Sequence, residues 1–449
     1  MSDSYQYSSL PISSDYTDRP SIRLLQILAP DTPDQDEDPP IRCQLSTHVL
    51  PRAIQEAPEY EALSYVWGSP QKNKTILVDS KALGVTENLH SALSRLRARE
   101  VGLMWIDAIC INQDDLKERG HQVAHMGQIY KTAKQVIVWL GEEDEESKPL
   151  FAALYKRARL DAELMGSLLK LFRRPYFRRI WVLQEVFAAR EALIMCGEDF
   201  IKNWPFYEQI QKSREDMNSD SIHWEKARRV LDLMLFSLPD DPTLGECLDM
   251  YHTQEATERS DKIFALVAMR KIVGSPPDVL IDYEVSWENL MQQVVHVILG
   301  NEAVAKTGEE RDRIFINCRL SIVGRVTLSP RDSFGFAPRP TIEYLPAEGT
   351  KPLPHTGFWW HAFAKHIQVG DLLCSIPGAE HPVIIRETDT GSFVILITAP
   401  VNEETCRGPI EKLNIWRAII QNSPRHARNR TLIWDWTAEE DSPPPESTQ

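Results

Sequence analysis

Two short apolar runs with a helical pattern between them constrain the fold more than any other stretch of this sequence. The first run, residues 103–106, stops at Asp107, and the second, residues 135–140, stops at Gly141. Each run predicts a buried strand of a parallel sheet. Between them apolar residues recur at spacings of three, four and three, at Val123, Met126, Tyr130 and Ala133. This spacing predicts a helix with one apolar face, so residues 103–141 predict a βαβ unit.

The polar loop predicted after the first of these strands, residues 107–119, is a candidate binding site. Ligands of open α/β sheets bind where loops leave the carboxyl ends of strands. The polar candidates in this loop are Asp107, Asn112 and Gln113. The alternative is that these side chains only cap and turn the backbone, because Asx side chains readily bond to their own main chain. Both interpretations stay open at this stage.

Strand and helix patterns alternate from residue 60 to residue 197, which predicts an α/β fold with a mostly parallel sheet flanked by helices. Ahead of them, residues 22–28 and 41–50 predict a first strand pair, and residues 75–79 and 83–85 predict a hairpin. Thr86 predicts the N-cap of a following helix. Residues 142–146 form an acidic loop, which is a candidate cover for the site.

The same patterns divide the chain into parts. Residues 1–20 and 437–449 predict disordered tails, because their composition is polar and, at the end of the chain, rich in proline. Residues 21–200 predict the α/β domain and residues 201–300 a helical region. Residues 301–436 predict a β-rich C-terminal domain, since their apolar residues alternate or run between glycine and proline turns.

Charge and cysteine usage narrow the partners and the compartment. The net charge of -15 argues against nucleic acid or an anionic membrane as a partner held by long-range attraction. No apolar run approaches the roughly 18 to 20 residues of a membrane span, and the N-terminus lacks the pattern of a secretory signal. The seven cysteines are scattered and include no CxxC pair, which favours a reducing, cytoplasmic location.

Familiar catalytic motifs are missing from the sequence. It contains no G-x-G-x-x-G, G-x-x-x-x-G-K-[ST], G-x-S-x-G or H-E-x-x-H, so several nucleotide-binding, hydrolase and metalloprotease classes lose their main support. His121 and His125 lie four apart and could face a metal, but two histidines on a surface helix are more often solvated, and we expect no metal site. Cys110 has no histidine placed to activate it, so a small buried residue is the better interpretation.

Three stretches in order resemble the signature blocks of the fungal HET (heterokaryon incompatibility) domain. They are YEALSYVWG at residues 60–68, the block at residues 103–144 that starts LMWIDAICINQDD, and RRPYFRRIWVLQEVFAAREALIMCG at residues 173–197. Residues 258–269, 281–290 and 370–396 resemble segments that follow in large HET proteins. The glycine-rich ending usual after the last segment is missing here, and residues 331–369 form a longer insert before it.

The resemblance implies a part in fungal non-self recognition and in the cell death that follows fusion of incompatible cells. The implied partner is a second copy of the chain or another incompatibility protein. A more distant resemblance concerns chemistry. The order of Leu63-Ser64-Tyr65, Trp105-Ile106-Asp107 and the helix opening WVLQE at residues 181–185 is similar to that of TIR domains. In catalytic TIR domains a glutamate four residues after a tryptophan sits in an NAD-cleaving site, which implies Glu185 as the catalytic residue and NAD as a substrate rather than a cofactor.

Elementary chemistry is compatible with this role for Glu185. Residues 181 and 185 are one helical turn apart and share a face, so Trp181 could stack on a base beside the carboxylate. Cleaving the bond to nicotinamide develops an oxocarbenium ion, whose charge a nearby carboxylate stabilises. Ser64, Tyr65 and Trp67 end a predicted strand whose side chains alternate between its faces, so some of them either wall the site or fill the core.

Two main hypotheses therefore remain, beside a third in which the chain is an inactive scaffold that keeps the fold without the chemistry. In the first, the chain is an incompatibility effector with a TIR-like core that binds and hydrolyses NAD. In the second, it is a non-enzymatic module of the same pathway that signals or assembles with itself. The side chain of Glu185 separates the two, because the enzyme needs it in an open cleft, whereas pairing with Arg178, Arg179 or Arg190 would make it structural. Trp181 as a core residue would also favour the second hypothesis.

Overall fold

The structure is a computed structural model that describes residues 4–11, 19–29, 39–53, 56, 58–213, 222–234, 242–272, 279–308, 313–328, 340–345, 367–379, 381–399 and 427–435. The chain forms two compact units. The first comprises residues 1–237 and 281–283, and the second comprises residues 238–280 and 284–449. The predicted helical region at residues 201–300 is thus divided between them. The predicted tail at residues 437–449 lies outside the described residues.

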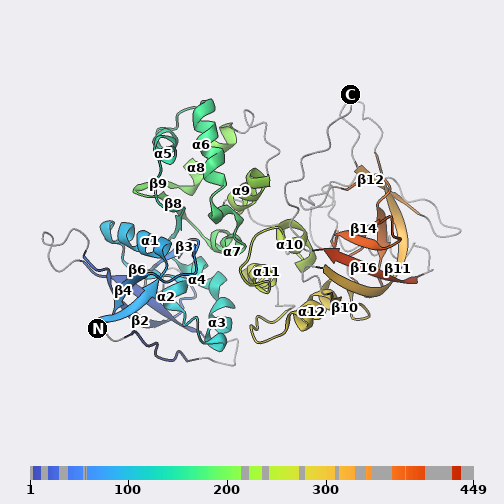
Figure 1. The fold of residues 1–449 in the computed structure, drawn as a ribbon, viewed down its shortest axis with the longest axis horizontal. Helices are drawn as coiled ribbons and strands as arrows, with labels where there is room; N and C mark the ends of the chain where they lie inside the picture. The colour runs from blue at the N-terminus through green and yellow to red at the C-terminus, as the bar shows by residue number, and fades with distance from the viewer. Residues whose placement is uncertain are drawn as a thin grey trace. The chain divides into compact units, whose positions relative to one another are not determined.

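The first unit is built on one sheet of nine strands in the order β5-β4-β2-β1-β6-β3-β7-β8-β9 (Figure 1). The strands are β1 (Ser21–Ile27), β2 (Arg42–Val49), β3 (Glu61–Ser64), β4 (Lys74–Val78), β5 (Lys81–Val85), β6 (Leu103–Trp105), β7 (Val136–Trp139), β8 (Ala192–Cys196) and β9 (Asp199–Lys202). The predicted strand pair and the predicted hairpin are confirmed as the antiparallel pairs β1–β2 and β4–β5.

The sheet is mixed, so the prediction of a mostly parallel sheet is wrong as a description of the whole sheet. Parallel pairings join β2 to β4, β6 to β3, β3 to β7 and β7 to β8, whereas the other four pairings are antiparallel. The central strands β6, β3, β7 and β8 are the parallel part. Two-residue connections explain two of the antiparallel pairs, β4–β5 and β8–β9, because only antiparallel strands can be joined by so short a turn. Asp79 and Ser80, with φ of 48° and 66°, make such a turn between β4 and β5.

Helices cover both faces of the central strands. The helices of this unit are α1 (Glu87–Ala98), α2 (Asp107–Cys110), α3 (Leu116–Val123), α4 (Met126–Thr132), α5 (Ser147–Tyr155), α6 (Ala162–Phe172), the 3-10 helix η1 (Pro175–Arg178), α7 (Trp181–Ala188), α8 (Asn203–Ser213) and α9 (Ile222–Leu233). On one face, Trp139 donates to Asn88 of α1 at 3.0 Å. On the other, the Trp105 ring meets Tyr130 of α4 edge-on at 5.4 Å. Every residue of β7 and β8 is buried, as expected for strands covered on both sides.

The helix caps follow the sequence signals, but the helix predicted between the two organising strands is broken. Thr86 accepts a hydrogen bond from the Leu89 backbone at 3.4 Å, so the predicted cap of α1 is confirmed. In the βαβ unit, α3 ends at Val123 and α4 begins at Met126. The predicted loop 107–119 is also shorter than expected, because α2 occupies its start. Asp115 then caps α3 by accepting from the Lys117 and Glu118 backbones.

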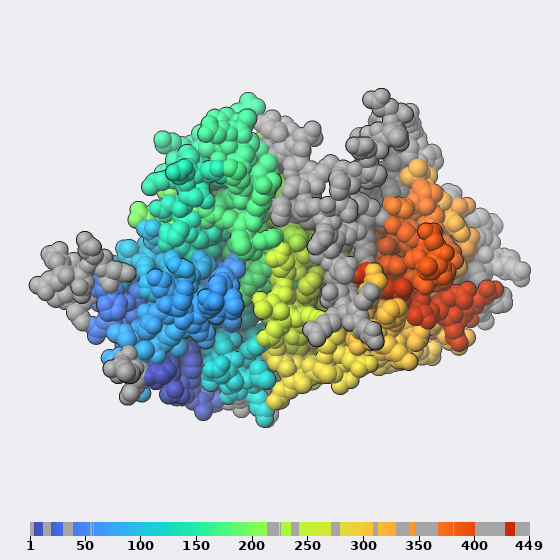
Figure 2. Space-filling view, viewed as in Figure 1, coloured from blue at the N-terminus to red at the C-terminus, as the bar shows by residue number. Residues whose placement is uncertain are grey.

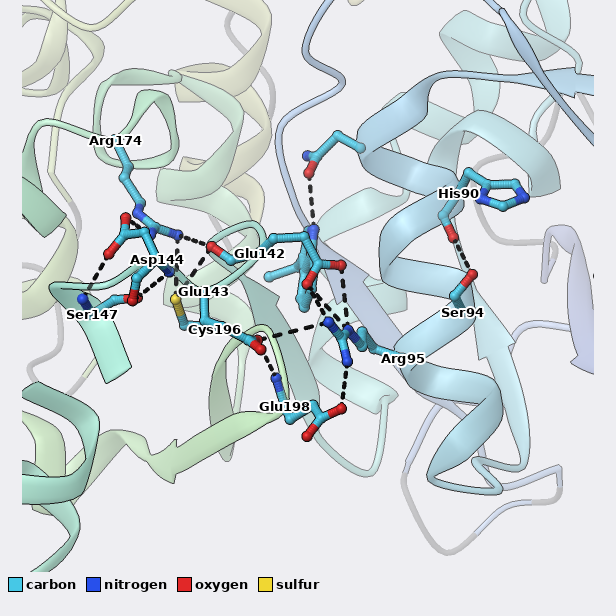
Figure 3. Close-up of polar contacts among 12 residues, drawn as sticks. His90, Ser94, Arg95, Glu142, Glu143, Asp144, Ser147, Arg174, Cys196 and Glu198 are labelled. Carbon is cyan, nitrogen blue, oxygen red and sulfur yellow. Dashed lines mark hydrogen bonds and ion pairs between the residues drawn. The ribbon is translucent and has the colours of Figure 1, made fainter. Parts of the chain in front are cut away.

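The acidic loop that follows β7 is held by two arginines (Figure 3). Arg174 donates to the Leu140 and Glu142 carbonyls at 2.9 and 3.0 Å and pairs with Asp144 at 2.7 Å. Arg95 of α1 pairs with Glu142 at 2.7 Å and with Glu198 at 2.6 Å. In Figure 2 the surface of α1, in light blue, adjoins that of the green segments after β7, which are far from it in sequence. The loop is therefore neutralised against its own unit.

Part of the segment predicted as an N-terminal tail is packed. Residues 4–11 run along the unit, where Leu10 is buried and the Tyr5 backbone donates to the Ala82 carbonyl of β5 at 2.8 Å. Arg23 of β1 donates to the Ser8 carbonyl at 2.6 Å and forms an ion pair with Glu118 at 2.5 Å. Both partners of this pair are almost fully buried. Residues 1–3 and 12–18 lie outside the described part of the chain.

In its described residues the second unit combines three helices with a sheet of seven strands. The elements are α10 (Leu244–Tyr251), α11 (Asp261–Ile272), α12 (Trp287–Leu299), β10 (Val304–Thr307), β11 (Arg313–Leu328), β12 (Pro340–Tyr344), β13 (Leu372–Ser375), β14 (Val383–Glu387), β15 (Phe393–Ile397) and β16 (Arg428–Asp435). The β-rich prediction is confirmed. The strand order is β10-β11-β13-β14-β15-β16, and β16 also pairs with β11, so five strands close on themselves.

None of the helices in the described ranges is both long and apolar enough to cross a lipid bilayer.

Candidate functional site

The predicted catalytic residue lies against the end of β3. Ser64, the last residue of β3, donates a hydrogen bond from Oγ to Oε2 of Glu185 on α7 at 2.5 Å. The Tyr176 hydroxyl, from η1, lies 2.8 Å from the same Ser64 oxygen. β3 and β6 are parallel neighbours with Ala62 opposite Trp105, so their carboxyl ends meet at one edge of the sheet. Ser64 and Asp107 therefore lie at this edge, where ligands of α/β sheets bind, and Glu185 joins them from α7 through its contact with Ser64.

Arg179 connects these groups. Its Nη1 donates to the Tyr65 carbonyl at 2.7 Å and lies 3.6 Å from Oε1 of Glu185. Its Nη2 lies 3.7 Å from Oδ2 of Asp107, which also accepts a hydrogen bond from the Trp67 indole at 2.9 Å. One cation thus lies between two carboxylates. We call this set, Ser64, Trp67, Asp107, Tyr176, Arg179 and Glu185, the Glu185 cluster.

The Glu185 cluster is enclosed. Glu185 is 1% exposed and Ser64 is 0% exposed, and Asp107 retains only 6%. Arg179, with 19% of its side chain exposed, and the half-buried Trp67 keep some contact with solvent. The Glu185 carboxylate therefore faces the interior and an arginine rather than an open cleft. By the criterion of the sequence analysis, this conformation favours the second, non-enzymatic hypothesis, and the first hypothesis requires another conformation in which the cluster is open.

Burial perturbs the titration of Glu185. Removal from water raises the pKa of its carboxyl from the ordinary 4.5 to about 7, and the nearby Asp107 charge adds to this, while Arg179 and the Ser64 hydrogen bond oppose it. Burial, followed by the charge of Glu185, also raises the pKa of Tyr176 and of Tyr130 well above the ordinary value. The cluster thus contains a carboxyl group that changes charge close to neutral pH, which is a property of general acids and bases.

The remaining candidates are Tyr65, Asn112, Gln113 and Trp181, and they lie in different surroundings. Tyr65 is buried and its carbonyl accepts from Arg179, while burial, followed by the charge of Asp107, raises the pKa of its hydroxyl well above the ordinary value. The Gln113 side chain donates to the Asp107 carbonyl at 2.9 Å, so it supports the loop. Asn112 accepts from the Asp114 backbone at 3.3 Å, which is the turn-forming role of the alternative interpretation. Trp181 is 6% exposed, as expected for a core residue.

Other residue types singled out in the sequence stay structural. Cys110 is fully buried, and burial raises the pKa of its thiol to about 12, so it is held as the neutral thiol. The His121 and His125 rings lie 4.8 Å apart, and Nδ1 of His125 bonds to the His121 carbonyl at 2.8 Å. In the described ranges no group of three or more histidine, cysteine, aspartate or glutamate side chains is arranged to hold a metal ion.

Two members of the Glu185 cluster were not candidates in the sequence analysis. Arg179 is one of three arginines near Glu185 in the sequence, and no pattern singles out Tyr176. Its hydroxyl is buried in the fold and finds a partner in Ser64, as a buried hydroxyl must. Nothing in the spacing distinguishes Arg179 from Arg178.

The pKa of Glu185 predicts how stability depends on pH. The unfolded chain loses this proton near pH 4.5 and the folded chain near pH 7, so between these values the folded state binds more protons and rising pH favours unfolding. At this residue we expect a loss of about 3 kcal/mol of unfolding free energy across that window. Urea unfolding at about pH 5 and pH 8 should show a loss that is larger by this amount in the native chain than in Glu185→Gln, in which Asp249, whose pKa burial also raises to about 7, still titrates. Equal pH dependence in the two proteins would contradict the shifted pKa.

Comparison with known proteins identifies the segment that holds the cluster. Residues 60–185 match the family model described as heterokaryon incompatibility protein (HET). A relative, heterokaryon incompatibility protein 6, OR allele, of Neurospora crassa, is 28% identical, and the match covers 32% of this chain and 29% of the relative. The chain thus matches less than a third of that relative. No solved structure matches the chain. The resemblance to the HET domain is confirmed, whereas the resemblance to TIR domains stays a prediction.

Proposed function

We propose, from the premise that residues 60–185 form a HET domain, that the chain acts in heterokaryon incompatibility and that its core binds and hydrolyses NAD when the Glu185 cluster opens. The observation that carries the chemical part is Glu185, a carboxyl group at the carboxyl end of β3 with a pKa of about 7. Ligands of α/β sheets bind at this edge. A carboxyl that titrates near neutral pH is suited to charge stabilisation and proton transfer.

In the proposed reaction the bond between the ribose anomeric carbon and nicotinamide breaks, and its electron pair leaves with neutral nicotinamide. The ionised Glu185 stabilises the oxocarbenium ion that remains. Water then adds to the anomeric carbon and gives up one proton, which leaves ADP-ribose. Ser64 holds the carboxylate in position through the 2.5 Å hydrogen bond. No protein group needs to form a covalent bond to the substrate.

Arg179 must move before this reaction can occur. Its guanidinium lies 3.6 Å from the Glu185 carboxylate and is anchored to the Tyr65 carbonyl, so a cationic nicotinamide ring would meet a like charge at this position. Displacing Arg179, the member of the cluster that keeps 19% of its side chain exposed, would leave Glu185 as the nearest charge to the substrate. The described conformation is accordingly a resting state in this proposal.

The test is the NAD content and growth of yeast expressing the full chain, Glu185→Gln or the control Glu191→Ala. Glu191 lies six residues further on, is exposed, and pairs with Lys202 at the surface. If the proposal is correct, NAD falls and growth stops with the native chain and with Glu191→Ala, while Glu185→Gln loses about a thousandfold of activity, the upper range for a single electrostatic group. Thermal unfolding of the purified proteins checks that both variants fold.

A second function is favoured by the enclosure of Glu185, which is 1% exposed. In this alternative the cluster only fixes α7 against β3, and incompatibility follows from assembly of the chain with itself or with another incompatibility protein. Cell death with unchanged NAD, or equal killing by Glu185→Gln, would support this alternative and remove the hydrolase.

A further inference from the structure

A hollow on the sheet of the second unit lies outside everything assigned above. It has a volume of about 680 Å³, within the usual range for small-molecule sites. Segments distant in sequence line it: residues before β10, the first half of β11, the turn before β15 and the first half of β16. These segments meet because β11 pairs with β10 and with β16, while β16 also pairs with β15.

Strand register collects polar side chains on one face of this hollow. Arg319 lies opposite Asn429, and Asn317 lies opposite Thr431, in the antiparallel pair β11–β16. Opposed residues share a face, and so do residues two apart on one strand. All four are exposed. Thr431 Oγ1 donates to Asn317 Oδ1 at 2.7 Å. The amide oxygen of Asn317 is thus engaged, and its amide nitrogen is the group that can donate to a ligand.

The charge of the lining is positive. Two arginines, Arg319 and Arg430, line the hollow together with one acid, Glu302. Arg319 lies on the face described above, whereas Arg430 lies opposite Cys318 and so belongs to the other face of β16. Neither arginine forms an ion pair with the described residues, whereas Arg313 and Arg386 of the same unit are paired with Asp435 and Asp371 at 3.2 and 2.7 Å. Arg430 instead lies over the Phe393 ring at 5.8 Å, a contact that restrains the guanidinium. The chain as a whole has a net charge of -15, whereas the charged residues that line the hollow are two arginines and one glutamate.

We propose that this hollow binds a small molecule that carries a phosphate group. Guanidinium groups match the geometry of phosphate oxygens and form short, charge-assisted hydrogen bonds to them. The amide and hydroxyl groups of the β11–β16 face supply further donors around the same space. A neutral sugar would use the amides equally well, but it would leave the two arginines without an anionic partner.

Isothermal titration calorimetry of the full chain with sodium pyrophosphate, at constant ionic strength, tests this proposal. We expect binding of one pyrophosphate per chain, weakened about tenfold or more by Arg319→Gln and by Arg430→Gln, since each removes a charge-assisted bond. Arg428→Gln is the matched control. Arg428 is exposed on the same strand two residues from Arg430 but does not line the hollow, and its loss should leave the affinity within about twofold.

Three results would overturn the proposal: no heat of binding at millimolar pyrophosphate, equal weakening by Arg428→Gln, or binding of maltose with no binding of pyrophosphate. The first removes the site, the second reduces it to general attraction by positive charge, and the third assigns the hollow to neutral sugars. None of these results depends on Glu185, so the hollow and the proposed hydrolase fail or succeed separately.

Discussion

Glu118→Ala is expected to lower the free energy of unfolding of the first unit by about 3 to 5 kcal/mol, the usual cost of breaking a buried ion pair. Glu118 accepts two hydrogen bonds from Arg23, at 2.5 and 3.0 Å, and a third from the Asn112 backbone at 2.7 Å. Removing the carboxylate leaves Arg23 charged and only 2% exposed. Urea unfolding of the full chain, followed by circular dichroism, measures the loss.

Two comparisons make this result specific. Lys134→Ala removes an exposed pair with Glu59 at 3.8 Å and should leave the unfolding midpoint unchanged, as is usual for surface pairs. The double variant Arg23→Met, Glu118→Leu should recover most of the lost stability, because no buried charge remains unpaired. If Glu118→Ala behaves like Lys134→Ala, the pair does not hold residues 4–11 and the start of α3 to β1.

The ion pair also illustrates which parts of the fold were predictable. Sequence signals were reliable where an element depends only on residues close to it in the chain. Thr86 caps α1, and β11 alternates exposed and buried residues along its first half. The tail prediction for residues 1–20 used only composition. It did not account for residues 4–11 because their partners, Arg23 and the edge strand β5, lie elsewhere in the chain.

Strand direction and the choice of charge partners both depend on contacts between segments that are distant in the sequence. A run of apolar residues predicts a strand but does not specify whether its neighbour runs parallel, so the mixed sheet could not be derived from the runs alone. The approach of Ser64 and Asp107 was predictable, because parallel strands place their carboxyl ends at one edge, but this rule does not place Glu185, which lies on α7. The selection of Arg179 from three nearby arginines depends on the turn at η1, which orients one guanidinium towards β3 and β6.

Asp249→Ala should have a comparable effect on the second unit. Asp249 of α10 accepts backbone hydrogen bonds from Thr398 and Ala399 at 2.9 Å and one from the Thr398 hydroxyl at 3.1 Å. All of these groups are buried, with Thr398 1% exposed. Alanine would remove the shared acceptor of these three donors, and each buried donor left unsatisfied costs about 1 to 3 kcal/mol. Because Thr398 retains a second acceptor, the Gly245 carbonyl at 3.2 Å, we expect a total loss of about 3 to 5 kcal/mol.

The matched control for this prediction is Asp389→Ala, in the exposed turn between β14 and β15, which should leave stability unchanged. Asp249→Asn should give an intermediate loss, because its amide oxygen still accepts hydrogen bonds while its amide nitrogen faces backbone donors. Urea unfolding of the three variants orders these effects. Asp249 and Thr398 are 149 residues apart in the sequence, so their hydrogen bonds join distant segments. If Asp249→Ala loses no more stability than Asp389→Ala, these bonds do not anchor the end of β15 to α10, and packing of the apolar core alone holds the helix to the sheet.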